Sequence, residues 1–367
     1  MKLRYKILSG VAITFTVAIT ALGIVLSNTD DCGPAPAVSS DSALMKAIVY
    51  RCYGSPDVLE FTDVAKPVPN DNEVLVKVKG SSVNPLEWHY MRGTPYLVRF
   101  MSGLGAPEST GLGTDFSGVV EAVGKDVSKF KVGDEVFGAS YAAFAQYITV
   151  REDRSIVLKP ANMTHQQTSS VAVAGITALQ ALRDVGKIEK GQKVLINGAS
   201  GGVGTFAVQI AKSFGAEVTG VSSAKNHDMV RSIGADHMID YKTENYTEAD
   251  KKYDLIIDMI GNHSLLTNRQ VMTEQGRLVM VGDSTGDWIE PLLGPLNSLI
   301  ISPFVNQKFE MFIASLKRTD IKELADLMEN GKLTPIVDVT YPLSETADAV
   351  RYSESGRAKG KIVIVID

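Results

Sequence analysis

The chain has 367 residues and a formal net charge of −5, from 37 Lys and Arg against 42 Asp and Glu. Its hydrophobic fraction of 44% and charged fraction of 22% exclude disorder of the whole chain, and the acidic balance gives no support for nucleic-acid binding. Two cysteines, Cys32 and Cys52, allow at most one disulfide and exclude a disulfide framework or a cysteine-rich zinc site.

The N-terminal segment differs from the rest of the chain. Residues 7–26 carry no charged side chain, and about 20 apolar residues can span a bilayer as a helix. A cleaved signal peptide usually has an apolar region of about 7–15 residues, so the pattern favours a retained single-pass anchor over export after cleavage. Lys2, Arg4 and Lys6 precede the run, which predicts a cytoplasmic N-terminus and places the remaining chain on the other side of the membrane. Only these three charges decide the orientation. Residues 27–43, rich in Ser, Pro and Asp, are typical of a linker.

A β-rich region is predicted over residues 44–165. Short strand-like stretches alternate with Gly- and Pro-containing turns, as at 117–124 and 134–140. Residues 74–78 alternate cleanly between apolar and polar side chains, which predicts a strand with one buried face. The first part of the chain after the linker is therefore expected to be a β-rich domain.

From Thr164 onward the pattern changes to alternating helices and strands. A helix is predicted to begin at Thr164, and another over 202–214 follows a short strand. Apolar runs such as 255–257 are continuous, which is typical of parallel strands covered on both faces. The pattern predicts an α/β domain over 166–301 and a return to the β-rich domain over 302–367.

The most informative stretch is a glycine-rich loop between a strand and a helix. In a dinucleotide site, glycines allow a tight turn, a close approach to the pyrophosphate and close packing of helix on strand. Gly201 and Gly204 occupy the second and third glycine positions of such a motif, whereas Ala199 occupies the first. A glycine-rich turn without a ligand is the less favoured alternative. The residues expected to bind phosphate are Ala199, Ser200, Gly201, Gly202, Val203 and Gly204.

The strand after this helix predicts which dinucleotide binds. An NAD site usually places a carboxylate at the end of the second strand, where it binds a ribose hydroxyl. Here Ser222, Ser223 and Lys225 follow that strand, and no carboxylate does. Two hydroxyls and an ammonium group suit a 2′-phosphate, so NADPH is favoured over NADH. Because NADPH is chiefly an intracellular cofactor, this prediction opposes the orientation that the three N-terminal charges indicate, and the side of the membrane stays open.

Motifs spread along the chain occur in the order SSVNPLEWHYMRG (81–93), GTDFSGVVEAVG (113–124), KVGDEVFG (131–138), AGITALQAL (174–182), NGASGGVG (197–204) and GRAKGKIVIVI (356–366). Because of these motifs and their order, the chain from about residue 44 to 367 resembles the medium-chain dehydrogenase/reductases, specifically their zinc-independent quinone oxidoreductase branch. The resemblance implies an α/β protein in which a GroES-like catalytic domain is split around a Rossmann domain, beside the apolar N-terminal helix.

The zinc site of related enzymes is not expected. Zinc-dependent members have Gly-His-Glu where this chain has Gly113, Thr114 and Asp115, and Thr is a poor zinc ligand. The five histidines show no ligand spacing and are predicted to be surface or turn residues. No metal is therefore expected.

The resemblance also implies a set of site residues. Asn84 is expected near the nicotinamide, where its amide would donate a hydrogen bond to a substrate oxygen; the alternative is a turn asparagine before Pro85. His89 and Tyr90 are expected to line the substrate pocket. Further cofactor contacts implied by the resemblance are Thr177, Tyr241, Gly261, Gly282 and Lys361.

These observations predict an NADPH-dependent oxidoreductase that transfers hydride to a small-molecule electrophile, a quinone or an α,β-unsaturated carbonyl compound. Two alternatives remain open at this stage. One is an alcohol or aldehyde reductase, and the other is a weakly active NADPH-binding sensor or interaction protein. The resemblance further implies a possible homodimer.

Overall fold

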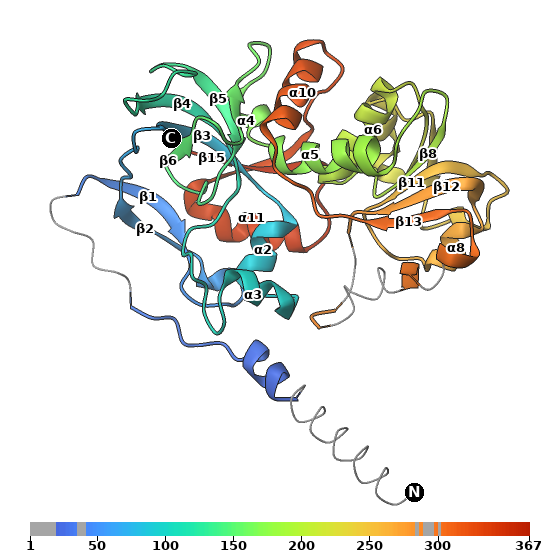
Figure 1. Ribbon diagram of the computed structural model, residues 1–367, viewed down its shortest axis with the longest axis horizontal. Helices are drawn as coiled ribbons and strands as arrows, with labels where there is room; N and C mark the ends of the chain where they lie inside the picture. The colour runs from blue at the N-terminus through green and yellow to red at the C-terminus, as the bar shows by residue number, and fades with distance from the viewer. Residues whose placement is uncertain (1–19, 35–41, 283–285, 289–296, 300–301) are drawn as a thin grey trace, which may run out of the picture.

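The protein consists of two sheet-containing units that lie side by side, with the helices α5 (Ala172–Gln180) and α10 (Arg318–Glu329) between them (Figure 1). The fold is described from a computed structural model. It describes residues 20–34, 42–282, 286–288, 297–299 and 302–367.

The β-rich unit contains nine strands and three helices within the described residues: β1 (Leu44–Val49), β2 (Glu60–Ala65), β3 (Glu73–Val83), α2 (Pro85–Arg92), α3 (Arg99–Ser102), β4 (Asp115–Val123), β5 (Glu135–Ala139), β6 (Tyr147–Arg151), β7 (Ile156–Leu158), β14 (Val337–Pro342), α11 (Thr346–Glu354) and β15 (Lys361–Val365). Strands β1 and β2 pair with each other, and the others form a sheet of order β14-β15-β3-β4-β5-β7, with β6 on β3. Because β3 is central, Leu75 is buried as well as Val74 and Val76, so the predicted single buried face is wrong there.

The second unit is a parallel sheet covered by helices. The short helix α4 (His165–Thr168) packs on the β-rich sheet and leads into this unit. The elements of the unit are α5, β8 (Lys193–Asn197), α6 (Gly202–Ser213), β9 (Glu217–Ser222), α7 (His227–Ser232), β10 (His237–Asp240), β11 (Tyr253–Asp258), α8 (Leu265–Arg269), β12 (Met272–Met280), β13 (Lys308–Met311) and α10. The strand order is β10-β9-β8-β11-β12-β13, and every pair is parallel. Leu255, Ile256 and Ile257 are fully buried, which confirms the prediction from their continuous apolar run. The order reverses between β8 and β11, where ligands bind in sheets of this kind.

Two predicted boundaries differ from the structure. The boundary at 301 falls before β13, which pairs with β12, so the Rossmann unit extends further along the chain. Helix α10 also belongs to it, because Ile321 and Leu324 lie in its core cluster. The helix predicted from Thr164 is divided into α4 and α5. Thr164 does cap the first piece, since its hydroxyl accepts from the Gln167 N–H.

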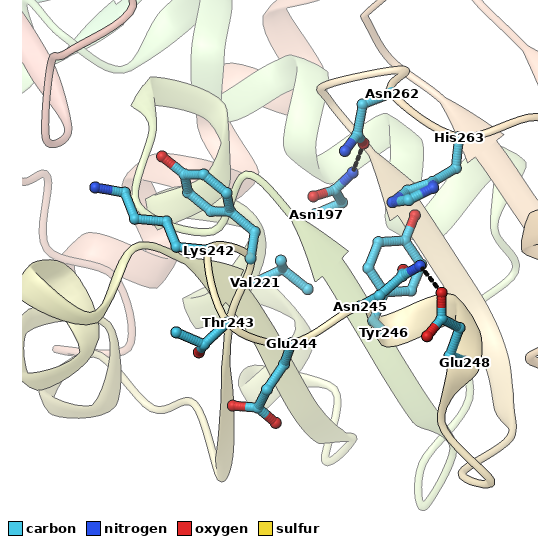
Figure 2. Close-up of a pocket in the computed structure, with 11 residues that line it drawn as sticks. Asn197, Val221, Lys242, Thr243, Glu244, Asn245, Tyr246, Glu248, Asn262 and His263 are labelled. Carbon is cyan, nitrogen blue, oxygen red and sulfur yellow. Dashed lines mark hydrogen bonds between the residues drawn. The ribbon is translucent and has the colours of Figure 1, made fainter.

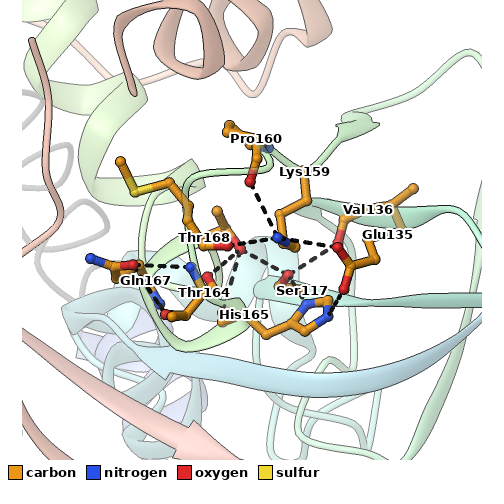
Figure 3. Close-up of polar contacts among 10 residues, drawn as sticks. Ser117, Glu135, Val136, Lys159, Pro160, Thr164, His165, Gln167 and Thr168 are labelled. Atoms are coloured by element: carbon orange, nitrogen blue, oxygen red, sulfur yellow. Dashed lines mark hydrogen bonds and ion pairs between the residues drawn. The ribbon is translucent and has the colours of Figure 1, made fainter. Parts of the chain in front are cut away.

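A polar cluster holds α4 against the β-rich sheet where the chain leaves that unit (Figure 3). His165, the first residue of α4, contacts Ser117 Oγ at 2.7 Å and Glu135 Oε1 at 3.1 Å. Lys159 lies 3.2 Å from the same Glu135 carboxylate. Ser117 is fully buried, so this Ser–His–Glu arrangement ties α4 to the β-rich sheet and exposes no nucleophile. The histidine predicted to be a surface or turn residue thus has a structural role.

The N-terminal predictions have a mixed outcome. Of the apolar run 7–26, residues 20–26 are helical and the rest lie outside the described residues. In the part of the chain that the structure describes, no helix is long and apolar enough to cross a membrane. The predicted linker 27–43 is wrong over its first residues, because Cys32 forms a disulfide with Cys52 of the β-rich unit.

Candidate active site

The glycine loop lies at the carboxyl end of β8 and leads directly into α6. Gly201 is the N-cap of α6, with φ −83° and ψ 179°, so its backbone is accessible to any residue type. A Cβ added to Gly201 would have only one neighbour within 4 Å, the Gly198 carbonyl oxygen at 3.4 Å. The protein itself therefore leaves room at Gly201, and that room lies beside the free N–H groups of a helix N-terminus, which suit a phosphate.

Gly204 has a different reason to be glycine. A Cβ there would collide with the carbonyl oxygen of Gly198 and would lie 2.8 Å from Ala199 Cα. Ala199 is itself fully buried, and its N–H donates to the Val221 carbonyl oxygen at 3.1 Å. Gly204 thus permits close packing of α6 on β8, whereas Gly201 keeps space open at the start of α6.

A pocket of about 460 Å³ lies at the carboxyl ends of β8 to β11 (Figure 2). Asn197, the last residue of β8, donates through Nδ2 to Asn262 Oδ1 and to Asp258 Oδ1, both at 2.9 Å. The position beside the glycine loop and the polar lining suit the adenosine end of a dinucleotide. The lining residues are Asn197, Val221, Tyr241, Lys242, Thr243, Glu244, Asn245, Tyr246, Glu248, Asn262 and His263.

The residues predicted to select the cofactor lie next to this pocket. Ser222 and Ser223 are buried at the end of β9, whereas Lys225 is exposed. Tyr241 lines the pocket and is 59% exposed. Sequence reasoning missed Asn226, whose Nδ2 donates to Ser200 Oγ at 3.0 Å and so links the end of β9 to the glycine loop.

Two other predicted cofactor contacts meet at the ends of β11 and β12. The Gly261 N–H donates to Asp258 Oδ1 at 3.0 Å, and the Gly282 N–H donates to the Asp258 carbonyl oxygen at 3.4 Å. Thr177 lies apart on α5, where its hydroxyl donates to the Val173 carbonyl oxygen at 2.7 Å. Contact of these three residues with a cofactor stays a prediction.

Asn84 belongs to a buried polar cluster formed by segments far apart in the sequence. Its Nδ2 donates to Asp115 Oδ2 at 3.1 Å, and its Oδ1 accepts from Lys361 Nζ. Asp115 is fully buried and also accepts from the Val173 N–H at 2.7 Å and from Ser82 Oγ at 2.6 Å. The side chain of Asn84 is therefore engaged by the protein. Because Nδ2 also donates to the Ser82 carbonyl oxygen at 3.4 Å, its predicted hydrogen bond to a substrate oxygen requires one of these two Nδ2 contacts to open.

Lys361 connects this cluster to the glycine loop. Its side chain is 3% exposed, and Nζ lies 3.5 Å from Asp115 Oδ2. The Cδ atom lies 3.3 Å from the position of a Cβ on Gly202, and the adjacent Gly360 N–H donates to the Ser200 carbonyl oxygen at 2.9 Å. The strand that ends the chain thus brings a buried cation to the point where the two units meet.

Glu87 is a second buried carboxyl group beside Asn84. Its Oε2 accepts from the Asn84 N–H at 2.6 Å, whereas its Oε1 has no hydrogen-bond partner among the described residues. Burial raises the pKa of Glu87 to about 7, and the nearby charge of Asp115 adds to the effect. At neutral pH the protonated and the ionised forms of Glu87 are therefore both populated. The motif Asn84-Pro85-Leu86-Glu87 contains this residue. The raised pKa of Glu87, however, depends on burial that the sequence does not display.

The residues predicted to line the substrate pocket lie on α2. His89 Nδ1 is 2.7 Å from the Thr94 carbonyl oxygen, and burial lowers the pKa of this histidine. Tyr90 packs against the β-rich core, and burial raises the pKa of its hydroxyl. Both residues follow Asn84 within two turns of helix. Their contact with a substrate stays a prediction.

No group of three or more His, Cys, Asp or Glu side chains is placed to hold a metal ion within the described residues. At the position where zinc-dependent relatives have their ligands, Thr114 precedes Asp115, and the Asp115 carboxylate is held by Val173, Ser82 and Asn84. The donor set does not fit a zinc site.

Comparison with known proteins agrees with this architecture. Residues 70–161 match the family model described as alcohol dehydrogenase GroES-like domain, and residues 233–364 match the model described as zinc-binding dehydrogenase. The chain is 32% identical to the mitochondrial NAD(P)H oxidoreductase RTN4IP1 of Bos taurus, over 89% of this chain and 90% of that protein. It is 30% identical to the quinone oxidoreductase of Homo sapiens, over 90% of this chain and all of that protein. The quinone oxidoreductase structure from Coxiella burnetii superposes with a TM-score of 0.77 at 26% identity, covering 89% of this chain and 100% of that chain.

Proposed function

Because the chain belongs to the medium-chain dehydrogenase/reductase superfamily, in its quinone oxidoreductase-like branch, and is an oxidoreductase of that family, we propose that it reduces quinones or α,β-unsaturated carbonyl compounds with NADPH and without zinc. The observation that carries this proposal is the approach of the buried Lys361, which contacts Asn84, to the first turn of α6. A phosphate-binding loop and a polar cluster therefore adjoin each other.

The loop and pocket support a dinucleotide cofactor, and the end of β9 supports NADPH. The open space at Gly201 fits a pyrophosphate, and the pocket beyond it fits an adenosine group. Ser222, Ser223 and Lys225 offer hydroxyl groups and a positive charge where a carboxylate would repel a 2′-phosphate. Titration followed by fluorescence or calorimetry should give NADPH a Kd at least tenfold below that of NADH. Equal affinities would contradict this assignment.

The proposed substrates follow from the chemistry available. When bound, the nicotinamide supplies the hydride. The chain supplies orientation and a low-water environment, because Asn84, Asp115 and Lys361 are all buried. A quinone or an activated alkene already has an electrophilic carbon and needs no Lewis acid to accept hydride. The human relative is itself named a quinone oxidoreductase.

Steady-state oxidation of NADPH with a panel of quinones, enals and simple aldehydes tests the proposal. Turnover of quinones or enals after dialysis against a chelator, with metal analysis of the same sample, is the expected result. Turnover of aldehydes alone would indicate an aldehyde reductase. Tight NADPH binding without any turnover would indicate a sensor. Stoichiometric zinc lost together with activity would contradict the metal-independent mechanism.

Two proposals concern where the protein acts and with what partner. We infer a membrane anchor from residues 7–26, and the full chain of unchanged mass should resist carbonate extraction from membranes.

We also infer a homodimer, and the exposed apolar residues Ile313 (90%) and Phe304 (84%) beside the edge strand β13 support a surface that a second copy covers. Light scattering at several concentrations measures that state, and a monomer throughout would contradict it.

A further inference from the structure

Residues 28–33, here called the strap, lie along the segment between α2 and β4 that contains α3. Thr29 pairs with Gly105, and the Asp30 N–H donates to the Gly105 carbonyl oxygen at 2.9 Å. A Cβ on Gly105 would lie 2.5 Å from Asp30 Oδ2, so the two segments are in close contact. The strap is thus bound to the β-rich unit in an extended conformation.

Arg99 connects the strap to the helix that carries the predicted substrate-pocket residues. It is 3% exposed and donates to the Asn28 carbonyl oxygen at 2.5 Å and to Thr29 Oγ1 at 3.1 Å. Its Nε donates to the carbonyl oxygen of Gly93, the C-cap of α2, at 2.9 Å. The same guanidinium lies 4.4 Å from the ring centroid of Tyr53. Movement of the strap would therefore remove two of the contacts that hold this guanidinium beside α2.

The strap gains little from burial. Residues 28–34 are all exposed, so the strap buries little apolar surface and is held by a few hydrogen bonds, among them the two from Arg99. Such a segment is expected to open readily unless something else retains it. Cys32, near its end, is bonded to the buried Cys52, which precedes Tyr53. The Cα atoms are 4.7 Å apart, within the range of protein disulfides.

We propose that Cys32 and Cys52 form an oxidative modification site that works as a covalent latch, which keeps the strap on the loop beside α2. Closing the latch breaks two S–H bonds and forms one S–S bond. The two electrons and two protons pass to a protein thiol oxidant in its disulfide form, which becomes a dithiol. Reduction by a dithiol reverses the reaction and releases the strap.

The latch has a consequence for location. Disulfides form and persist in oxidising compartments and are rare in the reducing cytosol. The N-terminal pattern of Lys2, Arg4 and Lys6 before an apolar run independently predicts that the chain after residue 26 lies on the non-cytoplasmic side. The disulfide and the charge pattern both favour the non-cytoplasmic side for the unit that carries Cys52, whereas the supply of NADPH, the proposed cofactor, is chiefly intracellular.

The first test counts thiols in the full-length protein purified without reductant. In denaturant, a maleimide reagent should add to neither cysteine before reduction and to both after it. Two additions without prior reduction, in protein taken from its native membrane fraction, would overturn the proposal.

The second test measures what the latch holds. Hydrogen exchange in residues 28–34 and 97–105 should become at least tenfold faster in Cys32→Ser and in the reduced wild type, and reoxidation should restore the slow rate. Ser27→Ala, an exposed substitution just before the strap, is the matched control and should exchange like the wild type. NADPH titration reports whether the Rossmann unit is intact in each variant. Unchanged exchange in Cys32→Ser would overturn the latch while leaving the proposed reductase function standing.

Discussion

The phosphate loop and the buried cluster around Asn84 lie next to each other but are encoded in opposite ways. The loop is a run of consecutive residues between β8 and α6, and its glycines are recognisable in the sequence. In the cluster, the bond from Lys361 to Asn84 joins residues 277 positions apart, and the bond from Asn84 to Asp115 spans 31. A turn that needs glycines at consecutive positions can be identified from a sequence motif. A polar network between distant segments can be identified only once the fold is known.

The largest effect is expected within the loop, from two substitutions that look alike in sequence. Gly204→Val should prevent folding, because its side chain would collide with the backbone of Gly198 and Ala199. Gly201→Val should fold normally and lose NADPH affinity by at least 100-fold, because only a ligand needs that space. Circular dichroism, thermal unfolding and NADPH titration distinguish the two. If Gly201→Val binds NADPH normally, the loop is not the phosphate site.

In the cluster, Lys361→Met should destabilise the protein by about 3 kcal/mol, because it leaves the buried Asp115 without its cation. NADPH affinity should fall too, since the side chain passes Gly202. Urea unfolding gives the free energy of unfolding. The exposed Lys359→Met is the matched control and should be near neutral. An equal effect of both substitutions would show that the cluster contributes little.

Glu87 should make stability depend on pH. Its folded pKa of about 7 lies above the ordinary value of 4.5, so the folded state binds a proton more tightly than the unfolded state. This contribution is fully present below pH 4.5 and is lost as pH rises through about 7. Urea unfolding between pH 5 and 8 should show a decline on the order of 1–3 kcal/mol that is absent in Glu87→Gln. The same slope in both proteins would assign it to other groups.

The smallest effect concerns cofactor choice. Lys225→Glu should reduce the preference for NADPH over NADH by roughly fivefold, because an exposed charge contributes only about 1 kcal/mol. Lys332→Glu makes the same charge change at an exposed site distant from β9 and should leave the ratio of the two Kd values unchanged. A lysine with no effect on this ratio would shift the selection to the buried Ser222 and Ser223.

Sequence reasoning was accurate where a pattern is local. The Thr164 cap and the strand and helix around the glycine loop were all predicted within a few residues. It failed where long-range packing decides. The boundary at 301 was placed too early because β13 follows a long connection from β12, and the linker was predicted without knowing that Cys32 meets Cys52.

The sequence by itself determined the two-unit architecture, the position of the phosphate loop and the absence of a carboxylate after β9, because each depends on residues that are neighbours along the chain. Only the tertiary structure decided that Lys361 reaches Asn84, that Asn84 is engaged by Asp115, and that Glu87 is buried deeply enough for its pKa to rise to about 7. The physical reason is that burial and electrostatic pairing depend on which distant segments pack together, whereas a turn or a helix start depends on the backbone at that point.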